Sequence, residues 1–441
     1  MLKKKQKKKK NKLKKHLPEI IYGTCCVAVF STMAFSVWHF LIKPDAQQTN
    51  INAPETPTTT IYAEVTTIPT ETVLTIQTSE TQLTTTETLT TTEITTTTTE
   101  ETTETTIPQK ITAEKILADM SIEEKVGQMF LIRTPRGYED FTEYKAGGYI
   151  MFAVDFDGRT PTDIQSLLAE FQQNSKVPMI IAVDEEGGYV NRVSKFPQFR
   201  DTPFSSPQKL FAQGGFEAIK NDATEKAQLL KSLGINVNLA PVCDVSVNEN
   251  DYIHGRSFGQ DAEQTAIFAE TVVKEMNNQG MGSVLKHFPG YGNNSDTHTG
   301  IVYDSRPYST FLESDFVPFK AGIEAGCGCV MVSHNIVSCI DEKYPASLSS
   351  KIHQTLRQEL NFDGVVMTDD LCMEAITQYT DGRDTAVLAI EAGNDMLIST
   401  DFIQQIPAVI NAVNSGEISE ERIDQSVLRI LNWKISLGII E

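Results

Sequence analysis

Eight short apolar runs, most of them separated by amphipathic stretches, constrain the fold of this 441-residue chain more than any other feature. The runs occupy residues 128–133, 147–153, 178–184, 235–242, 281–288, 327–334, 363–370 and 394–400. Helical periodicity is found in the segments 112–125, 161–174, 217–233, 261–279, 309–325, 349–360, 383–392 and 418–436. Runs that are apolar throughout predict strands buried on both faces, which is typical of a parallel sheet.

Eight such strands within residues 111–441 predict an α/β fold, a single (β/α)8 barrel of the TIM type. An open doubly wound sheet is the alternative, but no Gly-rich nucleotide-binding sequence follows the first run. The loops after the C-terminal ends of barrel strands form the catalytic face. Polar residues at the ends of the runs are therefore the candidates for a functional site.

The first 110 residues differ from the rest of the chain. Ten lysines within the first sixteen positions predict a basic cytoplasmic tail over residues 1–19. Residues 20–42 carry no charged side chain and are long enough for a transmembrane helix, so we expect a single-pass anchor in the cell membrane with an extracellular catalytic domain. A cleaved signal peptide, giving a secreted protein, is the alternative. Residues 43–110, with 28 threonines between Thr49 and Thr106, predict a disordered stalk.

Charge, cysteine spacing and histidine positions argue against a nucleic-acid ligand, a disulfide framework and a metal site. The formal net charge of −20 disfavours nucleic acid as a ligand. The seven cysteines are irregularly spaced and form no disulfide framework, and Cys327 and Cys329 are expected to be small buried hydrophobic residues. A metal-dependent barrel would need a His-x-His pattern at the end of the first run, which ends instead at Arg133. Asp395 lies near the start of its run, away from the catalytic end. We expect neither a metal nor a cofactor.

Charged residues follow the third, fourth and fifth runs. The third run ends at Asp184, with Arg192 eight positions later. Asp184 can accept hydrogen bonds from two sugar hydroxyls, and Arg192 can bind an acidic group or fix Asp184. Arg256 lies in the loop after the fourth run. The fifth run ends in Lys286-His287, and a lysine there is costly to bury without partners, which favours a position facing the pocket.

Two further sets of residues suit proton transfer and nucleophilic attack. Asp296 and His298 are separated by one residue, so both side chains can project to one side of an extended segment, where the carboxylate would orient the imidazole. The seventh run ends in Asp369-Asp370. Strand alternation directs Asp369 into the barrel with Met367, which makes it the candidate nucleophile, while Asp370 is expected to cap the following segment.

The chain resembles glycoside hydrolase family 3, in particular its β-N-acetylhexosaminidases. Five ordered blocks carry the resemblance: Asp184-x-Glu-Gly-Gly-x-Val-x-Arg192, Arg256-Ser-Phe, Lys286-His-Phe-Pro-Gly-Tyr-Gly, Asp296-Thr-His298, and the segment from Leu356 to Leu371 that contains Met-Thr-Asp369-Asp. They cover roughly residues 120–437. Tyr291 stands where a histidine is common in the family, and Cys372 where a small or polar residue is usual.

The resemblance implies a retaining mechanism with Asp369 as nucleophile, His298 as acid/base and Asp296 as its partner. It assigns the remaining residues to binding of N-acetylglucosamine, namely Asp184, Arg192, Arg256, Lys286 and His287. The expected activity is an exo-β-N-acetylglucosaminidase acting on cell-wall muropeptides or chitin-type oligosaccharides. The alternatives are a β-glucosidase or β-xylosidase, a β-N-acetylglucosaminide phosphorylase, and an inactive glycan-binding surface protein.

Overall fold

The computed structural model describes residues 112–441 except 138, 295–299, 301, 373–375 and 377–378. The predicted tail, anchor and stalk (1–19, 20–42 and 43–110) and the predicted Asp296 and His298 lie outside the described residues. Among the residues that are described, no helix is both long and apolar enough to cross a membrane.

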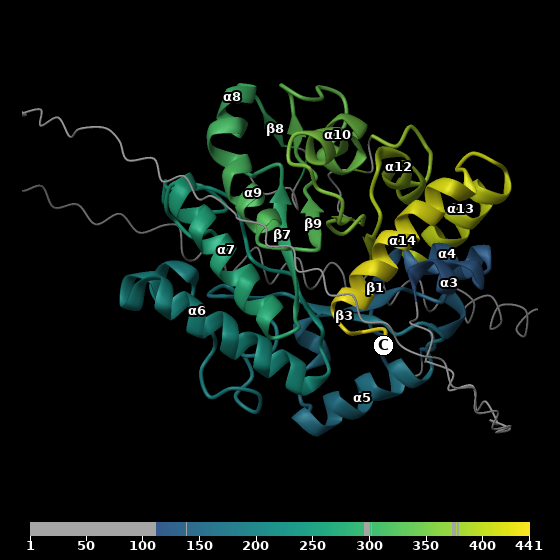
Figure 1. The fold of residues 1–441 in the computed structure, drawn as a ribbon, viewed down its shortest axis with the longest axis horizontal. Coiled ribbons are helices and arrows are strands. Elements are labelled where there is room, and N and C mark those ends of the chain that lie inside the picture. The colour runs from purple at the N-terminus through teal and green to yellow at the C-terminus, as the bar shows by residue number, and fades with distance from the viewer. Residues whose placement is uncertain (1–111, 138, 295–299, 301, 373–375, 377–378) are drawn as a thin grey trace, which may run out of the picture. The chain divides into compact units, whose positions relative to one another are not determined.

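Eight parallel strands form a nearly closed barrel surrounded by helices (Figure 1). They are β1 (Phe130–Arg133), β2 (Gly148–Met151), β3 (Ile180–Val183), β6 (Val237–Asn238), β7 (Gly282–Phe288), β9 (Cys329–Val332), β11 (Val365–Thr368) and β12 (Leu397–Ser399). From β1 to β11 each strand pairs with the next strand of the barrel, and β12 pairs with β1. Backbone hydrogen bonds from Thr368 to Met396 and from Leu371 to Ile398, both 3.0 Å, bring β11 against the β12 segment. The predicted α/β barrel is thereby confirmed.

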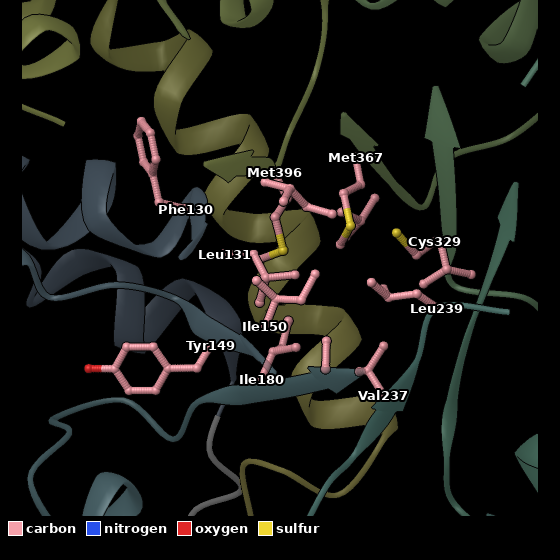
Figure 2. Close-up of a cluster of buried hydrophobic side chains, with 14 of the residues drawn as sticks. Phe130, Leu131, Tyr149, Ile150, Ile180, Val237, Leu239, Cys329, Met367 and Met396 are labelled. Atoms are coloured by element: carbon pink, nitrogen blue, oxygen red, sulfur yellow. The ribbon is translucent and has the colours of Figure 1, made fainter. Parts of the chain in front are cut away.

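Alternation along the strands fills the interior of the barrel. Leu131, Ile150, Val237, Cys329 and Met367 come from five different strands and belong to one buried cluster (Figure 2). Val366, next to Met367, belongs instead to a second cluster with residues of the outer helices. This is the alternation predicted for the seventh run, and it also buries Cys329 in the interior as expected.

Helices occupy most connections between strands. They are α5 (Pro161–Gln173), α6 (Pro207–Leu233), α7 (Ala262–Asn278), α8 (Tyr308–Thr310), α9 (Phe316–Glu324), α10 (Ser350–Gln358), α12 (Thr385–Ala392), α13 (Phe402–Asn414) and α14 (Glu420–Ser436). The predicted opening helix is two helices, α3 (Ala113–Ala118) and α4 (Ile122–Gln128), because Ser121 starts a new helix as an N-cap that accepts the Glu124 amide. Helix α13, which contains Pro407, was not predicted.

Helix α14 packs against α3 and α4, the first two helices of the described residues. Lys125 of α4 lies 2.8 Å from Glu420 and 2.7 Å from Asp424 of α14. Because Lys125 is buried while Glu420 remains exposed, this contact connects the interior to the surface. The start and the end of the barrel domain are therefore joined side by side (Figure 1).

Candidate active site

A buried lysine at the end of β7 connects two carboxylates that follow β3. Lys286 Nζ lies 2.7 Å from Asp184 Oδ1 and 2.6 Å from Glu186 Oε1. Arg192 is farther from Asp184, at 4.0 Å, and its side chain is about one-third exposed. The burial of Lys286 is therefore offset by two anionic partners.

Arg256 completes this charged cluster through Glu186. Its Nε and Nη2 donate to the two carboxylate oxygens of Glu186 at 3.0 and 2.7 Å. Burial by itself would raise the pKa of Glu186, but Lys286 and Arg256 outweigh that effect and hold the pKa well below its ordinary value. Burial likewise acts to lower the pKa of Lys286, and Asp184 and Glu186 reverse the shift, so the pKa is raised. Both groups are therefore charged at neutral pH.

His287 is oriented by an aspartate that follows β6. Its Nδ1 lies 2.7 Å from Asp244 Oδ2, and the other carboxylate oxygen accepts the Tyr291 amide at 2.8 Å. The ring's Nε2 lies 3.3 Å from Arg256 Nη2. Lys286 and His287 thus enter the same charged cluster, and the peptide bond between them is cis.

A fully buried carboxylate holds the loop that carries these groups. Glu185 accepts the backbone amides of Arg192, Val193 and Ser194 at 2.7–3.1 Å, and it also accepts the Ser194 hydroxyl. The segment between them is a short hairpin of β4 (Glu185–Gly187) and β5 (Val190–Asn191). Gly187 is needed at its turn because φ is +96° and a Cβ would lie 2.4 Å from the Ser205 carbonyl oxygen. The hairpin therefore presents Asp184 and Glu186 from a fixed backbone.

The two aspartates after β11 have different surroundings. The Asp369 carboxylate accepts the Asp370 amide at 2.8 Å, and both side chains are half-buried. Asp370 accepts the amides of Cys372 and Thr400 at 3.0 and 3.3 Å, and burial raises its pKa. The prediction that Asp370 binds the following segment is confirmed. Asp369 lies at the same end of the barrel as the charged cluster, because both follow the C-terminal ends of parallel strands.

The described residues on either side of the Asp296–His298 segment are held together. Before it, Asn294 donates to Asp304 at 3.0 Å, and Asp304 belongs to β8 (Tyr303–Asp304), which pairs with β10 (Ile336–Val337). Arg306 contacts Asp304 at 2.8 Å and Asp315 at 2.9 Å. Gly292 makes room for it, since a Cβ there would lie 2.4 Å from the Arg306 guanidinium. The described residues that flank the predicted dyad, Asn294 and Asp304, are thus hydrogen-bonded to each other.

Sequence reasoning missed two members of the cluster, Glu186 and Asp244. Glu186 stands two positions after Asp184, a spacing that places both on one side of an extended segment. Asp244 is the first acidic residue after the fourth run, at the end where catalytic residues gather. Both could have been found by applying the strand-end rule to every acidic residue. His334, which follows β9, is fully buried, and Ser347 Oγ lies 2.7 Å from its Nδ1.

Comparison with known proteins defines the family. The sequence model of the glycosyl hydrolase family 3 N terminal domain matches residues 121–433. The chain belongs to this family and is a glycoside hydrolase.

Its relatives include several hexosaminidases. A beta-hexosaminidase of Nitrosomonas eutropha is 30% identical over 294 residues, covering 64% of this chain and 83% of that protein. A beta-hexosaminidase of Xanthomonas campestris pv. campestris is 34% identical over 270 residues, covering 59% and 78%. Among solved structures, a family 3 beta-N-acetylglucosaminidase from Paenibacillus has a TM-score of 0.68 at 34% identity, covering 73% of this chain and 63% of that chain.

Proposed function

We propose that the protein is a retaining exo-β-N-acetylglucosaminidase that removes terminal β-linked N-acetylglucosamine from cell-wall muropeptides or chitin-type oligosaccharides. The observation that supports it most is the cluster in which Lys286 contacts Asp184 and Glu186 while Arg256 pairs with Glu186. Such a cluster offers charged donors and acceptors in a fixed geometry to the hydroxyl and amide groups of a sugar. The names of the relatives agree with this substrate class.

In the proposed mechanism, Asp369 attacks the anomeric carbon while His298 protonates the departing glycosidic oxygen. A covalent glycosyl-enzyme forms, and His298, now neutral, takes a proton from the water that attacks it. Asp296 orients the imidazole. The half-buried Asp369 at the strand end suits a nucleophile because its carboxylate is fixed by the Asp370 amide.

A matched pair of variants tests the nucleophile. Asp369→Asn should lower kcat on an aryl β-N-acetylglucosaminide roughly 10⁴-fold, whereas Asp370→Asn changes an adjacent carboxylate of similar burial and should retain far more activity. Equal losses in both variants would contradict the assignment. Hydrolysis of the aryl β-glucoside alone by the unmodified protein would exclude the proposed sugar specificity.

Phosphorolysis is the second candidate. A neutral histidine repels an anionic acceptor less than a carboxylate base does, which favours phosphate as an alternative to water. A beta-glucoside phosphorylase shares the fold, with a TM-score of 0.66 at 23% identity. Product analysis with and without inorganic phosphate distinguishes the two: formation of a sugar 1-phosphate would identify a phosphorylase.

We also propose that residues 20–42 anchor the protein in the cell membrane and hold the catalytic domain outside. The uncharged run preceded by ten lysines supports this arrangement. The test is fractionation of cells that express the full chain, followed by protease treatment of intact cells. Recovery of full-length protein in the membrane fraction with a protease-accessible catalytic domain is expected, and recovery of a shortened chain in the medium would indicate cleavage.

A further inference from the structure

Exposed large hydrophobic side chains are unevenly distributed over the described residues. One group lies on the outer helices and consists of Ile267, Leu312 and Ile403. All the others lie in connections that follow the C-terminal ends of strands, the end that carries the charged cluster: Val154, Tyr189, Val247, Tyr252 and Tyr303. Two of the tyrosines in this group have ring contacts that lead to the charged cluster, and exposed rings next to such a cluster are suited to binding a ligand.

Tyr189 has the largest exposure of this second group, at 83%. It sits at the turn of the β4–β5 hairpin, three residues after Glu186. Its ring lies against Gly255, where a Cβ would come within 2.6 Å of a ring atom. The next residue, Arg256, pairs with Glu186. Three extended residues span at most about 10 Å, so the Tyr189 ring stands beside the sugar-binding cluster.

Tyr252 extends this surface from the loop after β6. It is 41% exposed, and its ring centroid lies 6.0 Å from that of the buried Tyr291. Tyr291 in turn lies 5.4 Å from the His287 ring, edge to face. Continuous ring contacts therefore connect the exposed Tyr252 to the charged cluster. The loop from Asp244 to Arg256 carries a member of the cluster at each end and Tyr252 between them.

We propose that Tyr189 and Tyr252 form an acceptor-side subsite that binds the sugar ring on the far side of the scissile bond. This inference rests on the proposed function and specifies its substrate: a β-linked oligosaccharide with a second pyranose ring, rather than a glycoside with a small leaving group. A tyrosine ring offers a flat apolar face with a polar edge, which suits the apolar face and hydroxyl edge of a pyranose. Its few rotatable bonds keep the entropy lost on binding small.

The test compares two substrates that share the glycone and the type of leaving group. Methyl β-N-acetylglucosaminide has no second ring, and N,N′-diacetylchitobiose has one. We expect Tyr189→Ala and Tyr252→Ala each to lower the ratio of kcat/KM for chitobiose over the methyl glycoside about five- to tenfold, the size of one lost ring contact. Tyr189→Phe should retain most of the ratio. Gly255→Ala should lower it, because the added methyl displaces the ring without removing it.

Ile403→Ala is the control, since it removes an exposed hydrophobic side chain from α13, and its ratio should stay at the value of the unmodified protein. An unchanged ratio in both tyrosine variants, in a protein that hydrolyses both substrates, would overturn the subsite and leave the proposed function intact. If the unmodified protein hydrolyses neither substrate, the proposed function itself fails and the subsite with it.

Discussion

Both ends of the barrel bury charged side chains, but the two ends differ in the proportion of cations to anions. At the catalytic end, Lys286 lies between Asp184 and Glu186, and Arg256 pairs with Glu186. At the opposite end, the fully buried Asp395 faces three arginines: Arg357 at 2.6 Å, Arg429 at 3.2 Å and Arg422 at 3.8 Å. One end alternates cations and anions, and the other surrounds one anion with cations.

The remaining hydrogen bonds explain the difference. Around Asp395, the arginines also donate to backbone carbonyls: Arg357 to Phe362 and Gly364, Arg422 to Asn394, and Arg429 to Asp363. These bonds connect α10 and α14 to the segments that lead into β11 and β12. At the catalytic end the charged groups mainly contact one another, and Arg192 approaches Asp184 only to 4.0 Å. We therefore expect the Asp395 cluster to contribute to the stability of the fold, and the cluster around Lys286 to contribute to the proposed binding of the sugar.

The sharpest test of this comparison removes the central cation of the catalytic cluster. Lys286→Met leaves the buried carboxylates of Asp184 and Glu186 without their shared partner, so the free energy of unfolding should fall by about 3–5 kcal/mol. In the protein that remains folded, kcat/KM should also fall by about 10³-fold, because the cluster that we propose to bind the sugar loses its geometry. The measurement is kcat/KM on an aryl β-N-acetylglucosaminide, with urea unfolding to verify the fold. Lys320→Met, on the exposed face of α9, should have no effect, and a similar loss there would show that the assay does not report on the site.

At Asp395 we expect a loss of stability without a loss of kcat. Asp395→Asn leaves three guanidinium groups without an anion and should lower the free energy of unfolding by about 3–5 kcal/mol while kcat of the folded protein is unchanged. Urea titration with parallel kinetics measures both quantities. Asp363→Asn is the matched control, an exposed carboxylate near the same arginines, with an expected change below about 1 kcal/mol. A loss of kcat in Asp395→Asn would remove the distinction between the two ends.

A pH dependence should come from Lys434 of α14, which donates to Gln128 at 2.7 Å and is fully buried. Burial lowers the pKa of Lys434 to about 7. Between pH 7 and the ordinary lysine value the unfolded chain therefore binds more protons, so the free energy of unfolding should rise with pH by on the order of 5 kcal/mol. Lys434→Gln keeps a donor without the charge and should flatten this rise. A rise of equal size in the variant would assign it to other groups.

The smallest effect on activity is expected when Arg256 can no longer donate to both carboxylate oxygens of Glu186. Arg256→Lys keeps the charge but cannot donate in parallel to both carboxylate oxygens, so kcat/KM should fall about tenfold with little change in stability. The same substitution at Arg383, an exposed residue paired with Glu391 and Glu417, is the control and should leave kcat/KM unchanged. An unaltered kcat/KM in Arg256→Lys would mean that orientation of Glu186 is unimportant.

The sequence predicted the barrel strands well because their burial on both faces leaves continuous apolar runs, as in β9 and β11. The helix α13 escaped detection because Pro407 lacks the amide donor expected in a helix interior. The division of the opening helix at Ser121 was also missed, since a capping serine within a periodic stretch resembles an ordinary surface position.

The sequence identified several residues of the charged cluster, but not the contacts between them. Asp184, Arg256, Lys286 and His287 were identified, and the structure brings them together. Which carboxylate each cation contacts depends on the relative placement of different strands, which no local pattern contains. Glu186 and Asp244 were missed for this reason, although each turns out to hold a predicted residue in place.

The contact of α4 with α14 has a consequence for circular permutation of the barrel domain. Lys125 ties the first helices of the barrel domain to the last one, so its beginning and its end meet on one face. The packing of the barrel therefore does not depend on which connection holds the two chain ends. A circular permutant that links the end of α14 to the start of α3 and opens the chain in an exposed outer loop should fold to the same barrel.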